Sequence, residues 1–514
     1  MLNKIKSFYI ILEIFRNIKN KKKLKIIKYN KGIMNRLNIT KKEFQSYMDL
    51  KEFNTKYDTN IDDIEIEELD LSQIKIGNEG LKFLGKIFFK GLNTLNLNDT
   101  EISDINILSS FNLPDLVELD LSDNKISDIN ILQKVNFNKL EVLYLNDNKI
   151  SDINILKKVN FKKLKELDLG NNTLKDIKVL ENVNFKELEE LDLSDNRLAD
   201  INVLEKVDFK KLKELILGGI NLSDISILEK VDFKELTSLR LSRNNIKNIN
   251  ILSKVYFNEL TELYLSGIGT LDMNILPKLN FKKLKELYLG RNNIVNINIL
   301  EKVNFEGLEI LFLSKNDIVD INILEKVNFK DLKELDLSEN KITDINVLEK
   351  VNFNKLNILN LNNNKISDIN VLNKVKFEQL KELNLGNNLI SDLNKLEKVN
   401  FKELNVLDLS LNLIENINIL SKANFPKLEK LDLGYNKISN VNILPKIKFN
   451  ELNTLLLNDN QISKINAISK VNLNKLEKLD LSNNKINEGE NSSIISNLKL
   501  KIKELIISKK NNIW

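Results

Sequence analysis

The chain has 514 residues, with 78 Lys and Arg against 73 Asp and Glu, no Cys, no His, and only 4 Pro and 15 Gly. Without Cys there are no disulfides, thiol nucleophiles or zinc-finger ligands, and without His there is no Ser-His-Asp triad or imidazole proton shuttle. So few turn-forming residues argue against three or four ordinary domains in succession. We therefore expect one repetitive architecture.

The first 60 residues are a basic segment. Residues 1–44 carry 13 Lys and Arg and two acids, a net charge of +11, so the remaining 470 residues sum to 5 − 11 = −6. Apolar residues between Ile10 and Leu37 predict two or three short amphipathic helices. We treat residues 1–60 as a helical, basic N-terminal segment separate from the rest of the chain.

Targeting signals are weak in this segment. A short apolar stretch follows two lysines, but Glu13 interrupts it and no small-residue cleavage site follows. No apolar run approaches the ~20 residues of a membrane-spanning helix. We expect an intracellular, cytoplasmic protein without a transmembrane segment, with a secreted or cell-surface location as the alternative.

A 24-residue period dominates the chain after residue 60. A Leu recurs from Leu92 to Leu476, which is (476 − 92)/24 = 16 steps without a slip. A repeat of 26 residues opens the array at Ile66 and another closes it at Ile502, giving about 19 repeats in residues 61–514. Recurrence at this spacing indicates a solenoid.

Each position of the repeat has a physical role. The opening Leu-x-x-Leu-x-Leu points positions 3 and 5 outward and predicts a short strand, and identical strands joined by crossovers stack in parallel. The Asn side chain at position 9 can form hydrogen bonds with backbone groups where the chain turns. Asp at position 13 is placed as the N-cap of one helical turn. Phe at position 22 recurs from Phe137 to Phe449 as a spine that we expect to be buried.

The full pattern, Leu-x-x-Leu-x-Leu-x-x-Asn-x-Ile-x-Asp-Ile-x-x-Leu, resembles the leucine-rich repeat family, and within it the short repeats of internalins and protein-phosphatase regulators. The resemblance implies an α/β fold: a curved solenoid with a parallel β-sheet on the concave face and short helical or 3₁₀ segments on the convex face. The connectors at residues 77–88 and 488–498 look like the longer helices of ribonuclease-inhibitor-type repeats, and we interpret them as caps.

Residues 1–45 admit three interpretations. The spacing of Leu12, Ile14, Phe15, Leu24 and Ile27 resembles an F-box, which would dock a ubiquitin-ligase scaffold, although the leading Leu-Pro and the later Trp of that motif are missing. A small helical cap that seals the first repeat is the plainer interpretation. The third is a basic amphipathic surface for acidic lipid or nucleic acid. Because no aromatic residues form a basic groove here, we do not expect nucleic acid.

Departures from the repeat mark the candidate site. Position 5 is normally Asp or Asn, but five consecutive repeats carry apolar, aromatic or Arg residues there, and position 8 changes from acidic to Gly or basic in the same window. Tyr and Arg are scarce in the other repeats and dominate interface hot spots. We predict a concave partner-binding strip, roughly 20 Å long at ~4.8 Å per strand, made of Ile216, Arg240, Arg243, Tyr264, Tyr288, Arg291, Phe312 and Lys315.

Two repeats in this window also lose the Asn at position 9. They read Gly218-Gly219-Ile220 and Ser266-Gly267-Ile268, and we expect them to bare backbone beside the strip. The alternative is that aromatic pairs on adjacent strands only stabilise the sheet and that the glycines are neutral substitutions without a function.

Motifs for catalysis are missing. The Asp-rich strings fit no calcium loop, and the sequence contains no phosphate loop, dinucleotide-binding motif or nucleophile elbow. We also expect the concave carboxylates to be solvated, which leaves none desolvated as a general acid. We predict no enzyme, cofactor or metal, but a non-enzymatic scaffold that binds a protein or peptide on the concave face. The alternatives are an F-box-like substrate-recognition adaptor of a ubiquitin ligase and a surface-exposed internalin-like adhesion protein.

Overall fold

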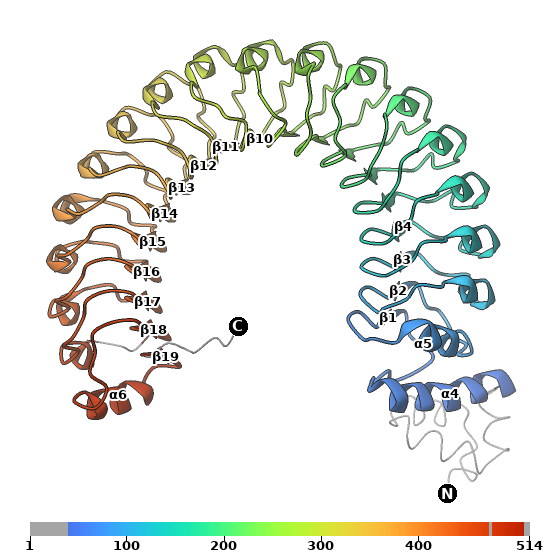
Figure 1. The fold of residues 1–514 in the computed structure, drawn as a ribbon, viewed down its shortest axis with the longest axis horizontal. Coiled ribbons are helices and arrows are strands. Elements are labelled where there is room, and N and C mark those ends of the chain that lie inside the picture. Colours follow the sequence, from blue (N-terminus) through green and yellow to red (C-terminus); the bar gives the residue numbers. More distant parts are fainter. Residues whose placement is uncertain (1–39, 472–474, 508–514) are drawn as a thin grey trace, which may run out of the picture. The chain divides into compact units, whose positions relative to one another are not determined.

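The structure is a computed structural model that describes residues 40–471 and 475–507. The chain divides into two compact units, which we call unit 1 (Met1–Arg240 with Val255–Phe257) and unit 2 (Leu241–Lys254 with Asn258–Trp514). Both units are built from the same repeat, a three-residue strand followed by a turn and a short helical connector. Within each unit the strands lie on the inner side and the connectors on the outer side (Figure 1).

The strands of each unit pair in parallel and in chain order, confirming the predicted leucine-rich repeat solenoid. The register joins equal positions of successive repeats, so that Leu263 lies beside Leu287. The described strands of unit 1 are β1 (Glu68–Asp70), β2 (Thr94–Asn96), β3 (Glu118–Asp120), β4 (Val142–Tyr144), β5 (Glu166–Asp168), β6 (Glu190–Asp192), β7 (Glu214–Ile216) and β8 (Ser238–Arg240). Those of unit 2 are β9 (Glu262–Tyr264), β10 (Glu286–Tyr288), β11 (Ile310–Phe312), β12 (Glu334–Asp336), β13 (Ile358–Asn360), β14 (Glu382–Asn384), β15 (Val406–Asp408), β16 (Lys430–Asp432), β17 (Thr454–Leu456), β18 (Lys478–Asp480) and β19 (Glu504–Ile506).

Most connectors are single 3₁₀ turns. Where position 13 is Asp, its carboxylate caps the turn, in most cases from one residue further out than the predicted N-cap: Asp128 accepts the N–H of Asn130 at 2.8 Å, while Ile129 is the flanking residue. In the turn that begins at Met273, the position-13 Asp272 is itself the N-cap. The described 3₁₀ turns of unit 1 are η2 (Asn106–Ser110), η3 (Asn130–Lys134), η4 (Asn154–Lys158), η5 (Lys178–Asn182), η6 (Asn202–Glu205) and η7 (Ser226–Glu229). Those of unit 2 are η8 (Ile249–Ser253), η9 (Met273–Lys278), η10 (Asn298–Lys302), η11 (Asn322–Glu325), η12 (Asn346–Glu349), η13 (Asn370–Asn373), η14 (Asn394–Lys398), η15 (Asn418–Ser421), η16 (Leu444–Lys446) and η17 (Ile468–Lys470).

The two end repeats carry α-helices instead, as their sequences predicted: α5 (Gly77–Leu84) and α6 (Ser492–Lys499). A third helix, α4 (Lys41–Tyr57), precedes the first repeat and begins with a capping box between Thr40 and Glu43. Its Phe53 is fully buried and lies 5.9 Å, ring to ring, from Phe83. This part of the basic segment therefore covers the start of the array.

The F-box-like interpretation falls on residues 1–45, most of which lie outside the described residues. Across residues 40–471 and 475–507, none of the helices combines the length and the hydrophobicity that crossing a bilayer requires.

The position-9 asparagines satisfy backbone groups at the turns and the Phe spine is buried, both as predicted, but the asparagines also bond across repeats and so form an asparagine ladder. Asn364 donates from Nδ2 to the carbonyls of Leu337 (3.0 Å) and Leu361 (3.1 Å), and its Oδ1 accepts the N–H of Ile342 at 3.0 Å. Because Leu337 and Ile342 belong to the preceding repeat, one side chain ties two repeats. On the outer side of the core, Phe353 is only 1% exposed.

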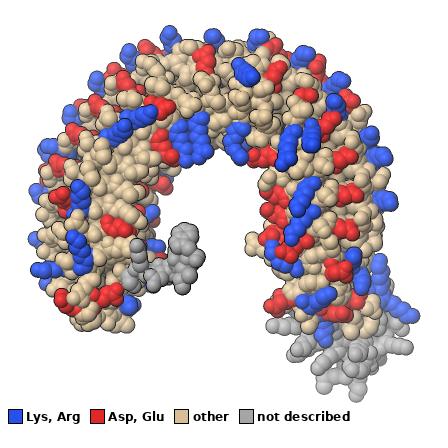
Figure 2. All heavy atoms as spheres, viewed as in Figure 1, with Lys and Arg blue, Asp and Glu red and all other residues tan. Residues whose placement is uncertain are grey.

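Charged side chains of both signs are interspersed over the surface of each unit (Figure 2). Many pair between equivalent positions of successive repeats, as Lys213 does with Glu189 and Lys355 with Asp331, each at 2.6 Å. These pairs are largely exposed, so each contributes little to stability.

Position 8 adopts the left-handed conformation, with φ between 45° and 67°, in each repeat from Asp99 to Asn483. Asp, Asn and Gly tolerate this conformation, which explains their frequency there. Gly219 and Gly267 therefore meet a turn requirement. The residues that follow them, Ile220 and Ile268, are both 1% exposed, and the N–H of Ile268 bonds to Asn292 at 2.9 Å, whereas Gly219 and Gly267 are themselves partly exposed.

Candidate functional site

Three aromatic side chains form a continuous stack on strands β9, β10 and β11 of unit 2. The Tyr264 and Tyr288 rings lie 4.2 Å apart at an interplanar angle of 7°, and the Tyr288 and Phe312 rings 4.8 Å apart at 21°. Register places the three residues side by side, and each side chain is half-buried. The predicted strip therefore contains three rings stacked face to face, which we call the aromatic stack.

An acidic row borders the aromatic stack. Glu262 and Glu286 precede the tyrosines by two residues on the same strands, and the Tyr288 hydroxyl donates to Glu286 at 2.9 Å. The Tyr264 hydroxyl donates to Glu262 at 3.3 Å. Burial and the hydrogen bond to Glu286 raise the pKa of Tyr288 above its usual range, so the phenol stays neutral and a donor at physiological pH.

A basic row lies beyond the strands, at position 8 of the following turns. It consists of Arg243, Arg291 and Lys315. A Cβ on Gly267 would lie 3.8 Å from the Arg243 Cα and 3.9 Å from the Arg291 Cβ, so the two arginines flank Gly267. Lys315 pairs with Glu339 at 3.0 Å. The aromatic stack thus has an acidic and a basic border.

The other two predicted site residues belong to unit 1. Ile216 and Arg240 pair in register on β7 and β8, and the Arg240 Nε lies 2.7 Å from the Glu214 Oε1. The structure therefore groups the eight predicted residues into a set of two in unit 1 and a set of six in unit 2.

The usual Asp or Asn at position 5 has a structural role that sequence reasoning missed. In all eleven described repeats that carry it, its Oδ1 accepts the N–H two residues later, as Asp336 does from Ser338 at 2.8 Å. An aromatic ring cannot accept this bond. In the aromatic stack the Ser266 hydroxyl instead accepts from Gly290 at 3.2 Å. The Ser242 hydroxyl likewise accepts from Ser266 at 3.2 Å, so Tyr264 and Tyr288 replace a local bond with one from the preceding repeat.

The concave carboxylates of unit 1 are not uniformly solvated, and the prediction that they would be was wrong. Burial, together with the adjacent Asp192, raises the pKa of Asp168 to about 7, and burial with the adjacent Glu214 raises that of Glu190 to about 7. Parallel register sets these like charges directly opposite each other. Among the described residues, no group of three or more acids is arranged to hold a metal ion.

Replacing Asp168 with Asn is expected to stabilise unit 1 by about 1 kcal/mol at pH 8 and to have almost no effect at pH 4. The raised pKa means that folded Asp168 holds its proton in the window between about 4 and 7, so its ionisation costs stability as pH rises through that window. Asn can still accept from Gly170, as Asn384 does from Gly386 at 3.0 Å.

Urea unfolding at the two pH values measures this gain. The matched control is Asp120→Asn, since its cross-strand neighbours, Asn96 and Tyr144, carry no charge. An equal gain at pH 4 and pH 8 would contradict the electrostatic explanation.

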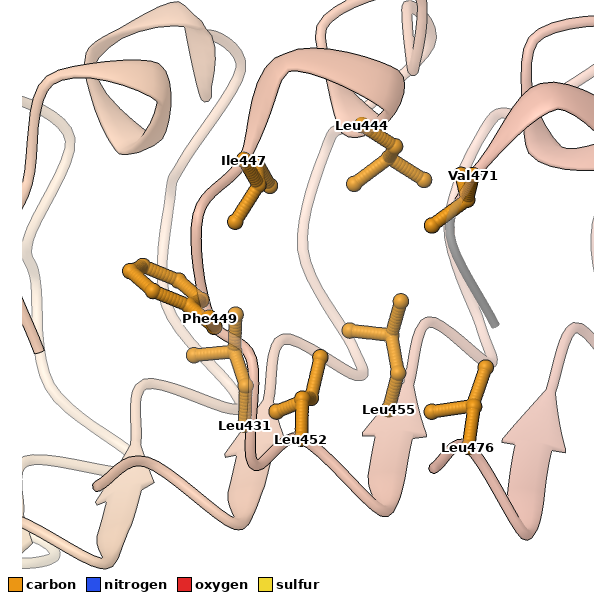
Figure 3. Close-up of a pocket in the computed structure, with 8 residues that line it drawn as sticks. All are labelled: Leu431, Leu444, Ile447, Phe449, Leu452, Leu455, Val471 and Leu476. Carbon is orange, nitrogen blue, oxygen red and sulfur yellow. The ribbon is translucent and has the colours of Figure 1, made fainter. Parts of the chain in front are cut away.

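An apolar cavity of about 40 Å³ lies inside unit 2 (Figure 3). Ligand pockets usually measure roughly 300–1,000 Å³, so this space is a packing gap between the strand layer and the outer connectors. It is lined by Leu431, Leu444, Ile447, Phe449, Leu452, Leu455, Val471 and Leu476.

Family models of leucine-rich repeats match five segments of the chain. The model described as "Leucine Rich repeats (2 copies)" matches residues 138–182 and 306–350, "Leucine Rich Repeat" matches 475–498, and "Leucine Rich repeat" matches 112–129 and 426–441. No curated protein matches the sequence significantly.

Solved structures of leucine-rich repeat proteins are also similar. An internalin from Listeria monocytogenes is 24% identical, with 84% of this chain and 94% of that chain covered and a TM-score of 0.37. A Leptospira interrogans leucine-rich repeat protein is 23% identical over 77% and 97%, with a TM-score of 0.47. The plant peptide hormone receptor RGFR1, in complex with RGF2, is 21% identical over 81% and 67%, with a TM-score of 0.48.

The 24-residue period, the parallel strands, the asparagine ladder and the matched family models agree with one another. This chain is built of leucine-rich repeats, the repeat that the family models match.

Proposed function

We propose that the protein is a non-enzymatic scaffold that binds a protein or peptide on the concave face of unit 2, with the aromatic stack at the centre of the contact. The leucine-rich repeat fold is typical of interaction scaffolds and receptors. The observation that carries the proposal is that Tyr264, Tyr288 and Phe312 stay partly exposed while giving up the strand-end hydrogen bond that Asp or Asn makes elsewhere.

The borders of the aromatic stack define the chemistry of the ligand. Because the rings cover one another's faces, apolar groups of a ligand would pack against the ring edges. Acidic groups complement Arg243, Arg291 and Lys315, and basic groups complement Glu262 and Glu286. The favoured ligand is thus a peptide or protein segment with an apolar centre and opposite charges on its two edges.

Replacing both Tyr264 and Tyr288 with Ala is expected to cost about 2 kcal/mol or more of partner affinity, roughly a 30-fold rise in Kd, since hot-spot aromatics contribute this much. The melting temperature should change little, because the rings are only half-buried. The partner is first identified by affinity capture from the native cell with the full chain, and Kd is then measured by calorimetry.

The matched control is Tyr144→Ala in unit 1. Tyr144 occupies the same repeat position and donates to Glu166 at 2.9 Å, but its strand neighbours, Asp120 and Asp168, are not aromatic. Equal affinity of the wild type and the double variant for a verified partner would rule out the aromatic stack as the binding site.

A further inference from the structure

A second exposed apolar surface lies on the turns that follow strands β14, β15 and β16 of unit 2. Its four side chains, which we call the loop patch, are Leu389 (47% exposed), Leu411 (46%), Leu413 (38%) and Tyr435 (51%). Leu411 and Tyr435 occupy position 8 of successive repeats, and Leu389 and Leu413 occupy position 10.

Backbone hydrogen bonds hold the loop patch together across repeats. The Leu411 N–H donates to Gly434 in the next repeat at 2.9 Å, and the Leu413 N–H donates to Ile390 in the preceding repeat at 2.9 Å. Since successive strands are ~4.8 Å apart, Leu411 lies in the repeat next to that of Tyr435, and Leu413 in the repeat next to that of Leu389.

Leu411 and Tyr435 are unfavourable for the fold where they stand. Both have φ 54°, the left-handed conformation for which the flanking repeats use Asn387 and Asp459. A large side chain in this conformation is strained, and here burial does not compensate because about half of each side chain is exposed. Strain without burial is characteristic of residues that serve binding.

The charges around the loop patch indicate what it binds. Position 10 reads Lys365, Leu389, Leu413 and Lys437 in four successive repeats, so two exposed lysines bracket the two leucines. Of the neighbouring acids, Asp459 and Asp480 raise the pKa of the Tyr435 phenol, and Glu415 follows Leu413 by two residues. The basic ends of the leucine row favour an acidic partner.

We propose that the loop patch is a second interaction surface, independent of the aromatic stack, that binds an apolar segment of a partner protein flanked by Asp or Glu. The apolar residues of that segment cover Leu411, Leu413 and Tyr435, and its acids pair with Lys365 and Lys437. The basic segment of residues 1–44, with its net charge of +11, is the wrong sign to occupy the patch.

The test uses the full chain, the double variant Leu411→Asn with Tyr435→Asn, and a phage-displayed library of random 16-residue peptides selected on the immobilised wild type. Selected peptides are expected to carry apolar pairs flanked by Asp or Glu, and synthetic copies are expected to bind the double variant at least 10-fold more weakly. The melting temperature of the variant should rise by about 1–3 °C, because Asn suits the left-handed conformation.

Two control variants show where on the protein the selected peptides bind. Leu500→Asn removes a leucine of unit 2 that is 85% exposed and lies outside the patch, and it should leave binding unchanged. The double variant of Tyr264 and Tyr288 should also bind as the wild type does; loss there would move the peptides to the aromatic stack and overturn the proposal.

Three further results would overturn it. Peptides that bind the wild type and the loop-patch variant equally, or that carry Lys and Arg flanks, would contradict the predicted chemistry. A fall in the melting temperature of the loop-patch variant would show that Leu411 and Tyr435 serve the fold. A wild-type dimer in sedimentation that the variant abolishes would make a second copy of the chain the occupant.

Discussion

Replacing Phe353 with Ala is expected to lower the free energy of unfolding of unit 2 by about 3–5 kcal/mol. The side chain is 1% exposed and belongs to the spine, where each Phe fills the space between strand and outer connector. The repeats stack without a common centre, so neighbours cannot collapse far into the cavity that Ala would leave. Urea unfolding measures the loss, and hydrogen exchange of the adjacent repeats locates it.

The control for this substitution is Tyr256→Ala. Tyr256 precedes the spine residue of its own repeat by one position but is 79% exposed, so its truncation should cost less than about 0.5 kcal/mol. A loss below about 1 kcal/mol for Phe353→Ala would mean that the spine contributes little to stability.

Replacing Asn364 with Ala is expected to destabilise unit 2 by about 3 kcal/mol or more, because it leaves buried backbone groups without partners. The carbonyls of Leu337 and Leu361 lose a donor, and the N–H of Ile342 loses its acceptor. The same unfolding measurement applies.

Asn362→Ser is the matched control, two residues away in the same turn. Other repeats carry Ser at this position, as at Ser338 and Ser410, so little change is expected. Equal losses from the two substitutions would contradict the ladder as the source of stability.

The repeat itself could be predicted in detail, because each of its contacts recurs with the same residue type every 24 residues. Asn recurs where a side chain must both donate and accept, as at Asn364, and Phe recurs where a large apolar side chain is fully buried, as at Phe353. The aromatic stack could be predicted too, since parallel register carries equal positions side by side.

Other features depend on geometry that residue types conceal. The left-handed turn at position 8 was hidden because Arg291, Leu411 and Tyr435 occupy it beside the expected Asp, Asn and Gly. The raised pKa of Asp168 follows from its burial beside Asp192. The alternating strand pattern predicted only that Asp168 points outward, and therefore did not predict this burial. The division of the predicted strip between two units could not be predicted either. The units are defined by the contacts within each of them, whereas the unusual position-5 residues run through consecutive repeats on both sides of the division.

The asparagine ladder also gives the array a direction. Each Asn completes the turn of the repeat before it, so within a unit a repeat depends on its C-terminal neighbour to saturate its backbone. During synthesis, a repeat that has just left the ribosome stays open until the next one emerges. Shortening a unit from its C-terminal end removes the Asn that closes the last remaining turn, whereas shortening it from the N-terminal end removes carbonyl acceptors instead, such as that of Ile390 for the Leu413 N–H.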